Sequence, residues 1–271
     1  MKLGIGSYTY PYSAGLGWRP GVRRLTIFEL LERARQLGVR VVQYCDNLPL
    51  TRLSDEELGQ FEQALQQTGL QVELGTRGLQ DTAELLRHLR LAQRFGASFV
   101  RLVVDAAGFE PSPEECVERL RAVLPEFREA GVKLALENHD RFTSRTLVRI
   151  IEQTDPAWVG ICLDTVNSFG SLEGPEVVVP ALAPYTLNLH LKDFTIARVP
   201  NQLGFVVQGC PLGRGRLQVP WVLEVLRRSG RDVNAIIELW TCVPDTNTDP
   251  WALEQEWAEQ SVRHARQWID L

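Results

Sequence analysis

The sequence predicts an α/β protein, a single (β/α)8 TIM barrel formed by residues 1–271. Short apolar runs rich in β-branched residues alternate with longer amphipathic runs, which is typical of βαβ units in a parallel sheet. Eight such short runs are present, and glycines separate several helical runs from the strand that follows. Eight equivalent units favour a closed barrel over an open sheet, because closure removes both sheet edges.

The expected strands are short and mostly apolar. They cover residues 3–7, 39–44, 70–74, 99–104, 132–137, 159–163, 186–191 and 234–239. Because helix, glycine and strand recur in the same order, we expect the carboxyl ends of the strands at one rim of the barrel. Active-site residues of such barrels lie at that rim.

Several of the intervening helices have recognisable ends. Ser54 and Glu57 form a capping-box pattern, and Gly69 ends the helix that they begin. Residues 26–38 end in the same way at a glycine. Residues 112–131 begin with Ser-Pro and also end at a glycine. These boundaries support the alternating order of helices and strands.

Two stretches between these elements show no regular period. The longest covers residues 194–218, and it carries Arg198, Arg214 and Arg216 among several glycines. A second long loop covers residues 9–23, after the first strand. A loop as long as the first in a compact barrel is usually functional.

Composition limits the partners that we expect. The net charge is −5 and the pI is about 5.5, which argues against nucleic acid because such a partner favours a basic face. No apolar run is long enough for a signal peptide or a membrane span, so we expect a cytoplasmic protein without a membrane partner. The cysteine count of five is odd, and no Cys-x-x-Cys pair occurs, which predicts reduced, mostly buried thiols.

Four consecutive strands each end near one ionisable side chain. These side chains are Glu137, Asp164, His190 and Glu238, on expected strands five to eight. A carboxylate at the end of an apolar strand is costly to desolvate unless a cation or donor compensates it, and three grouped carboxylates repel one another. A divalent cation resolves both problems. Each residue alone has another explanation, such as a cap, a salt bridge or a core histidine, but four successive strand ends favour a metal site.

Three oxygen ligands and one imidazole favour Mn²⁺, with Mg²⁺, Co²⁺ and Zn²⁺ as alternatives. The ligand set also leaves coordination positions for substrate oxygens, as a catalytic site requires. The sequence therefore predicts one catalytic divalent metal ion.

The local motifs at these strand ends are ALENH at residues 135–139, LDTVN at 163–167, HLKD at 190–193 and IIELW at 236–240. Together with the later GCPLGRGRL, they resemble the xylose-isomerase-like barrel superfamily of sugar-phosphate isomerases and epimerases. The resemblance covers essentially the whole chain and is weak in the first four units. It implies a small carbohydrate as substrate, and the four residues as metal ligands. It also implies a homo-oligomer, a dimer or a tetramer.

The resemblance further implies that Glu137 and Glu238 act as the acid–base pair. One glutamate would remove a proton next to a carbonyl, and the other would return a proton to the enediolate. One position departs from the family, because Asn167 stands where ketose epimerases have a histidine. Asparagine carries no proton near neutral pH, which puts ketose epimerisation in doubt and leaves the metal site intact.

Other polar side chains near the rim are candidate substrate contacts. They are Asn167, Lys192, His139, Arg77, Arg101 and Gln43. Lys192 could instead form a salt bridge with a rim acid, and His139 could be an exposed loop residue. Arg101 lies inside an apolar strand and needs an anionic partner, either a barrel carboxylate such as Glu73 or a substrate anion.

Four functions are compatible with such a barrel. The first is an isomerase or epimerase of a small sugar, sugar acid or sugar phosphate. The second is a lyase, a dehydratase or decarboxylase of a keto-sugar acid on the same metal site; Asn167, and Arg77 and Arg101 as carboxylate binders, favour it. An endonuclease with three zinc ions is disfavoured, because the chain has only four histidines and two of them fall in helical patterns. A non-catalytic binding protein is the fourth.

Overall fold

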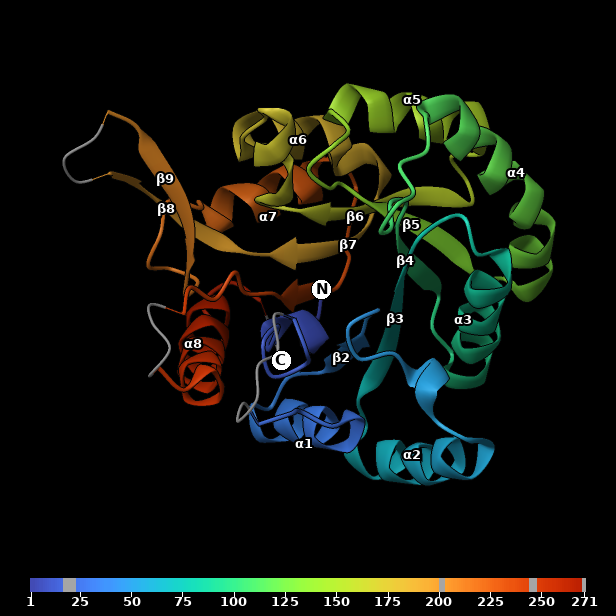
Figure 1. Cartoon of the computed structure of the whole chain (residues 1–271), viewed down its shortest axis with the longest axis horizontal. Helices are drawn as coiled ribbons and strands as arrows, with labels where there is room; N and C mark the ends of the chain where they lie inside the picture. The colour runs from blue at the N-terminus through green and yellow to red at the C-terminus, as the bar shows by residue number, and fades with distance from the viewer. Residues whose placement is uncertain (17–22, 200–202, 244–247, 270–271) are drawn as a thin grey trace.

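Eight parallel strands close into a barrel in the computed structural model, which describes residues 1–16, 23–199, 203–243 and 248–269. Their order around the barrel is β1-β10-β7-β6-β5-β4-β3-β2 (Figure 1). The strands are β1 (Leu3–Gly6), β2 (Val41–Tyr44), β3 (Gln71–Arg77), β4 (Phe99–Val103), β5 (Lys133–Glu137), β6 (Val159–Asp164), β7 (Thr186–Leu191) and β10 (Ala235–Ile237). The predicted barrel is confirmed, and its strands match the expected apolar runs to within a few residues.

Helices follow the strands and surround the barrel (Figure 1). They are α1 (Ile27–Gln36), α2 (Asp55–Thr68), α3 (Thr82–Phe95), α4 (Pro113–Ala130), α5 (Ser144–Thr154), α6 (Pro175–Leu182), α7 (Val219–Arg228) and α8 (Pro250–Ala265). The short 3-10 turns are η1 (Ser7–Thr9), η2 (Leu50–Arg52), η3 (Asn167–Ser171) and η4 (Ala183–Tyr185). The predicted capping box of α2 is present, because Ser54 accepts a hydrogen bond from the Glu57 amide.

The expected long loop at residues 194–218 contains an antiparallel hairpin instead. Strands β8 (Asp193–Arg198) and β9 (Phe205–Cys210) pair over their full length and reach outward from the barrel (Figure 1). The sequence-based interpretation of an irregular loop was wrong here. Most of β9 is exposed, so it lacks the alternation of buried and exposed residues that identifies a half-buried strand.

The long segment after β1 is tied to the last helix. Glu254 of α8 is fully buried and accepts hydrogen bonds from the amides of Tyr12 and Ser13 and from the Ser13 hydroxyl. Residues 17–22 of this expected loop lie outside the described residues. Burial of Glu254 outweighs these hydrogen bonds and raises the pKa of its carboxyl group to about 7.

The raised pKa of Glu254 predicts a pH-dependent stability. Between about pH 4.5 and pH 7 the unfolded chain loses this proton before the folded chain does, so the contribution of Glu254 falls as the pH rises. We expect Glu254→Gln to remove this contribution, which is roughly 3 kcal/mol at most. Urea unfolding at pH 4.5 and pH 7.5 gives the difference in free energy of unfolding between the unmodified protein and Glu254→Gln, and we expect this difference to change between the two pH values.

The exposed Glu256 on the same helix supplies the control, since Glu256→Gln should leave the pH dependence as it is in the unmodified protein. Parallel pH profiles for the unmodified protein and Glu254→Gln would show that Glu254 does not hold its proton in the folded state.

Candidate active site

The four predicted ionisable side chains lie together at one end of the barrel. Glu137 ends β5, Asp164 ends β6, His190 lies in β7 and Glu238 directly follows β10. These strands are neighbours, and their register places Asp164 and Ile236 on either side of His190. All four side chains are buried, with at most 3% of any of them exposed. Glu137 pairs with Cys162, two residues before Asp164, and Glu238 lies two residues after Ile236, so the four side chains converge from staggered positions on adjacent parallel strands.

One imidazole nitrogen faces three carboxylates. His190 Nδ1 lies 3.2 Å from Glu238 Oε1, 3.4 Å from Glu137 Oε2 and 3.9 Å from Asp164 Oδ2. One oxygen of Asp164, both oxygens of Glu238 and His190 Nδ1 are buried, and in the described part of the chain their polar contacts are ion-pair contacts with one another and with Lys192. Buried acceptors that converge in this way fit a divalent cation.

The ligand atoms form two overlapping groups. Candidate atoms of Asp164, His190 and Glu238 all lie within 4.8 Å of one another. Glu137 belongs to an adjoining group with Cys162 and the same His190. The residues present thus fit a metal ion held by the first three side chains, with Glu137 at its border.

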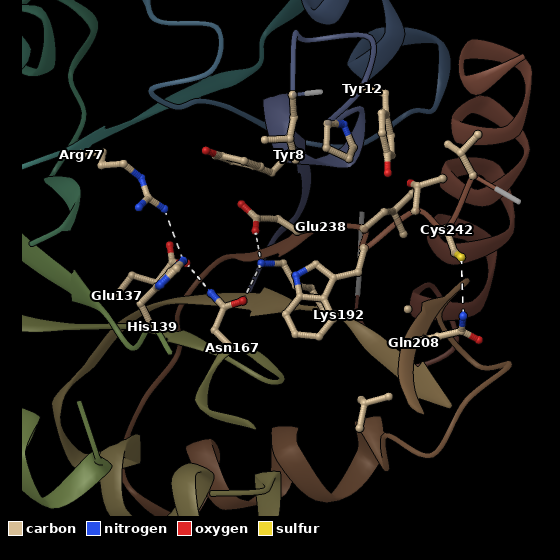
Figure 2. A pocket seen from close by; sticks show the side chains of 18 of the residues that line it. Tyr8, Tyr12, Arg77, Glu137, His139, Asn167, Lys192, Gln208, Glu238 and Cys242 are labelled. Atoms are coloured by element: carbon tan, nitrogen blue, oxygen red, sulfur yellow. Dashed lines mark hydrogen bonds and ion pairs between the residues drawn. The ribbon is translucent and has the colours of Figure 1, made fainter. Parts of the chain in front are cut away.

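Lys192 brings a positive charge into this cluster. Its Nζ lies 2.8 Å from Glu238 Oε2 and 3.3 Å from Asn167 Oδ1 (Figure 2). It also lies 2.8 Å from Asp164 Oδ2. Burial disfavours the charged ammonium, but the carboxylates of Asp164 and Glu238 outweigh this effect and raise the pKa of Lys192. The side chain is therefore a permanent cation beside the candidate metal site.

Arg101 of β4 compensates the charge of Glu137. Its Nε donates to Glu137 Oε2, and its Nη1 donates to Asp46 Oδ1 at 2.9 Å. The partner is thus a barrel carboxylate, as predicted, but it is Glu137 and not the suggested Glu73, which lies among amide side chains deeper in the barrel. Burial alone would raise the pKa of Glu137, but the charges of Arg101 and His190 lower it.

Asn167 holds the second oxygen of Glu137. The residue begins the 3-10 turn η3 directly after β6, and its Nδ2 donates to Glu137 Oε1 at 2.7 Å. Its Oδ1 accepts from Lys192. Asn167 therefore links Glu137 to Lys192, and both oxygens of Glu137 carry a donor.

A cavity of about 550 Å³ opens above these residues (Figure 2). Its walls include aromatic side chains from the loops after β1 and β10: Tyr8, Tyr12 and Trp240. At another side Arg77 Nη2 lies 3.3 Å from His139 Nε2, and Arg77 Nε lies 3.5 Å from Asp46 Oδ2. The cavity thus combines an apolar wall with several charged groups.

Most of the candidate substrate contacts line this cavity. Among them are Arg77, Arg101, His139, Asn167 and Lys192, and Glu137 and Glu238 reach it as well. Gln43 is different, because it is fully buried and hydrogen-bonded to Glu73, Asn188 and His190 beneath the cavity. The structure therefore corrects the expectation that Gln43 faces substrate.

One cavity wall was missed at the sequence level. It is formed by residues 207–209 of β9 and residues 241–243 after β10. No sequence signal identified the first group, because β9 was interpreted as part of an irregular loop. Cys162 was also missed, although it lies two residues before Asp164 on the same strand.

The last residue of the HLKD motif shapes the loop after the hairpin. The Asp193 carboxylate accepts hydrogen bonds from the amides of Phe194, Gly213, Gly215 and Leu217, each at 2.8 to 2.9 Å. A Cβ atom at Gly215 would lie 2.2 Å from Asp193 Oδ1, so this close approach requires glycine. Asp193 thus anchors the Gly-rich loop that follows β9.

The chain belongs to the xylose isomerase-like TIM barrel family, whose model matches residues 31–269. A relative from Pectobacterium atrosepticum, 3-oxo-isoapionate decarboxylase, is 33% identical over 97% of this chain and 94% of its own length. This relative is an enzyme. The match of the family model confirms the resemblance that the strand-end motifs predicted.

Solved structures share the fold at lower identity. D-psicose 3-epimerase from Clostridium cellulolyticum H10, solved with D-tagatose, superposes with a TM-score of 0.73 at 17% identity, covering all of both chains. A xylose isomerase-like barrel protein from Mycobacterium smegmatis, in complex with magnesium, gives 0.66 at 20% identity over 88% of each chain. Among the described residues, no helix is long and apolar enough to cross a membrane.

The charge balance of the site predicts the effect of removing Lys192. Lys192→Met leaves the buried carboxylates of Asp164 and Glu238 without their ammonium partner, which typically costs about 3–5 kcal/mol. We expect this loss in urea unfolding with a chelator present, and a larger rise in melting temperature on adding Mn²⁺ than in the unmodified protein.

Lys133→Met is the matched control, because Lys133 is exposed at the opposite end of β5. Equal stability of Lys192→Met and Lys133→Met in chelator would contradict the compensating role of Lys192.

Proposed function

We propose that this protein is a divalent-metal-dependent decarboxylase of a keto-sugar acid that works through an enediolate. The observation that carries the proposal is the unequal state of the two candidate catalytic glutamates. Both oxygens of Glu137 accept hydrogen bonds from Arg101 and Asn167, whereas the described polar partners of Glu238 are the Lys192 ammonium, 2.8 Å from Oε2, and His190 Nδ1, 3.2 Å from Oε1. Epimerisation needs one group to remove a carbon-bound proton and another to return one, and decarboxylation needs only the second step.

The decarboxylation step requires no base. The bond between the carboxylate carbon and the carbon beside the keto group breaks, and CO2 leaves. The electron pair of that bond forms a double bond to the keto carbon, while the carbonyl π pair moves onto the keto oxygen. A proton from solvent then adds to the carbon that lost the carboxylate, and the carbonyl re-forms. A divalent ion held by Asp164, His190, Glu238 and Glu137 would supply Lewis-acid stabilisation of the negative charge that develops.

The side chains around the ligands suit the same step. The Lys192 ammonium lies at the cavity floor, where it stabilises negative charge on the enediolate oxygen. Arg77 offers a guanidinium to the substrate carboxylate, and Tyr8 and Trp240 give the sugar carbons an apolar wall. The similarity to a decarboxylase over nearly the whole chain supports this assignment.

Epimerisation is the second candidate, because Glu137 and Glu238 both reach the same cavity. It requires Glu137 to exchange its donors for a proton during the reaction. The buried Arg101 opposes this exchange, since protonation of Glu137 would leave a buried guanidinium with less compensation.

Turnover in deuterated buffer separates the two functions. The protein is supplied with Mn²⁺ and offered a panel of 3-oxo sugar acids and ketoses. We expect release of CO2, one deuterium on the product carbon that carried the carboxylate, and loss of turnover after chelation. Isomer formation with deuterium incorporation and no CO2 would instead establish epimerisation.

Arg77 is expected to distinguish acids from neutral sugars. Arg77→Met removes a charge-assisted hydrogen bond, so we expect the KM for a keto acid to rise about ten- to hundredfold. Metal affinity, measured by Mn²⁺ titration, should stay unchanged because Arg77 does not touch the four ligands. Arg90→Met, at an exposed site on α3, is the control. An unchanged KM in Arg77→Met would remove Arg77 from carboxylate recognition.

A further inference from the structure

We propose that Gln43 is a positioning residue that fixes the tautomer of His190, and that Glu73 holds the Gln43 amide in the orientation this requires. The inference rests on the metal site of the proposed function and concerns the layer of polar side chains beneath it. Gln43 reaches His190 from β2 through the barrel interior, and neither side chain is exposed. The relevant atom is His190 Nε2, on the far side of the ring from the carboxylates.

Both described neighbours of His190 Nε2 can accept a hydrogen bond. Gln43 Oε1 lies 2.9 Å from this nitrogen, and Cys162 Sγ lies 3.2 Å from it. The Cys162 thiol directs its own proton to Asn188 Oδ1 at 3.5 Å, which leaves the sulfur lone pairs for the imidazole. A proton on Nε2 satisfies this arrangement, whereas a lone pair there would face two other acceptors.

Glu73 determines which way the Gln43 amide points. Gln43 Nε2 donates to Glu73 Oε2 at 3.2 Å and to Asn188 Oδ1 at 3.1 Å. Rotating the amide by half a turn would place its oxygen against the Glu73 carboxylate and its amino group against His190. Because amide nitrogen and oxygen differ only in their hydrogen bonds, the neighbouring acceptors fix the orientation.

The other partners of Glu73 are also amide donors. Asn188 Nδ2 donates to Glu73 Oε2 at 3.0 Å, and Asn234 Nδ2 donates to Glu73 Oε1 at 2.8 Å. Glu73 is nearly buried, with 4% of the side chain exposed, so these amides replace its contact with water. The carboxylate therefore has a constant set of donors and acts as the fixed end of the chain Glu73–Gln43–His190.

A proton on Nε2 leaves the Nδ1 lone pair directed at the candidate metal position. His190 Nδ1 is the nitrogen that lies 3.2 to 3.9 Å from the three carboxylates. In the opposite tautomer Nδ1 would carry a hydrogen and donate it to Glu238, so the imidazole would not be a ligand. Outer hydrogen bonds to a ligating histidine typically change metal affinity about ten- to hundredfold.

The test compares metal affinity with stability in variants of the full chain. For Gln43→Leu we expect Mn²⁺ affinity to fall about ten- to hundredfold. In the Zn²⁺-loaded protein, the ¹⁵N–¹H signal of His190 Nε2–H should shift and exchange faster with water. Unchanged affinity together with an unchanged Nε2–H signal would overturn the proposal.

Two further variants separate positioning from a merely structural role. Gln43→Glu keeps an acceptor for His190 Nε2–H but sets two carboxyl groups against each other, so stability should fall while Mn²⁺ affinity stays within about threefold. Asn234→Ala removes a donor to Glu73 without touching Gln43, and it should likewise lower stability alone. Affinity that follows stability in all three variants contradicts the proposal.

Metal binding by the unmodified protein separates the metal site from the positioning role of Gln43. An unmodified protein that binds neither Mn²⁺ nor Zn²⁺ overturns the metal site and the positioning role together. An unmodified protein that binds metal with no change in Gln43→Leu overturns the positioning role alone. Neither result depends on the identity of the substrate.

Discussion

Compensation of buried negative charge is the constraint on which the active-site end of this barrel depends. Glu137, Asp164 and Glu238 lie at the ends of apolar strands, where leaving a carboxylate without a partner costs several kcal/mol. Two buried cations share the compensation: Lys192 for Asp164 and Glu238, and Arg101 for Glu137. A third positive centre, the candidate metal ion, would lie where His190 Nδ1 faces all three carboxylates.

The polar layer beneath the carboxylates follows from the same constraint. A barrel interior filled only with aliphatic side chains would give His190 no hydrogen-bond acceptor and would leave its tautomer undetermined. The amides of Gln43 and Asn188 supply acceptors without adding charge, and Glu73 supplies one charge that three amide donors surround. The site is thus organised by charged groups at the rim and by oriented dipoles below it.

The sequence predicted the position of the four ionisable side chains better than their surroundings. Glu137, Asp164, His190 and Glu238 were placed together because a strand's end can be located from its apolar period, and parallel strands end at one rim. Gln43 was misassigned, because alternation indicates that a side chain points inward but does not give its depth in the barrel. The partner of Arg101 depends on a contact between distant segments, which a local sequence pattern does not predict. The hairpin β8–β9 contains a mostly exposed strand, which lacks the alternation that predicts a strand.

The choice between decarboxylation and epimerisation depends on hydrogen bonds more than on the metal. Members of one fold family with the same ligand set would stabilise the same enediolate, so the ligands alone do not distinguish the reactions that form it. The distinction lies in whether a carboxylate is free to take a proton from carbon. Arg101 and Asn167 each donate a hydrogen bond to one oxygen of Glu137. If Glu137 took a proton from a substrate carbon, its charge would be lost and its buried ion pair with Arg101 would be disturbed. Loss of CO2 forms the enediolate without that proton transfer, so the charge compensation that stabilises the fold also favours the reaction that needs no base.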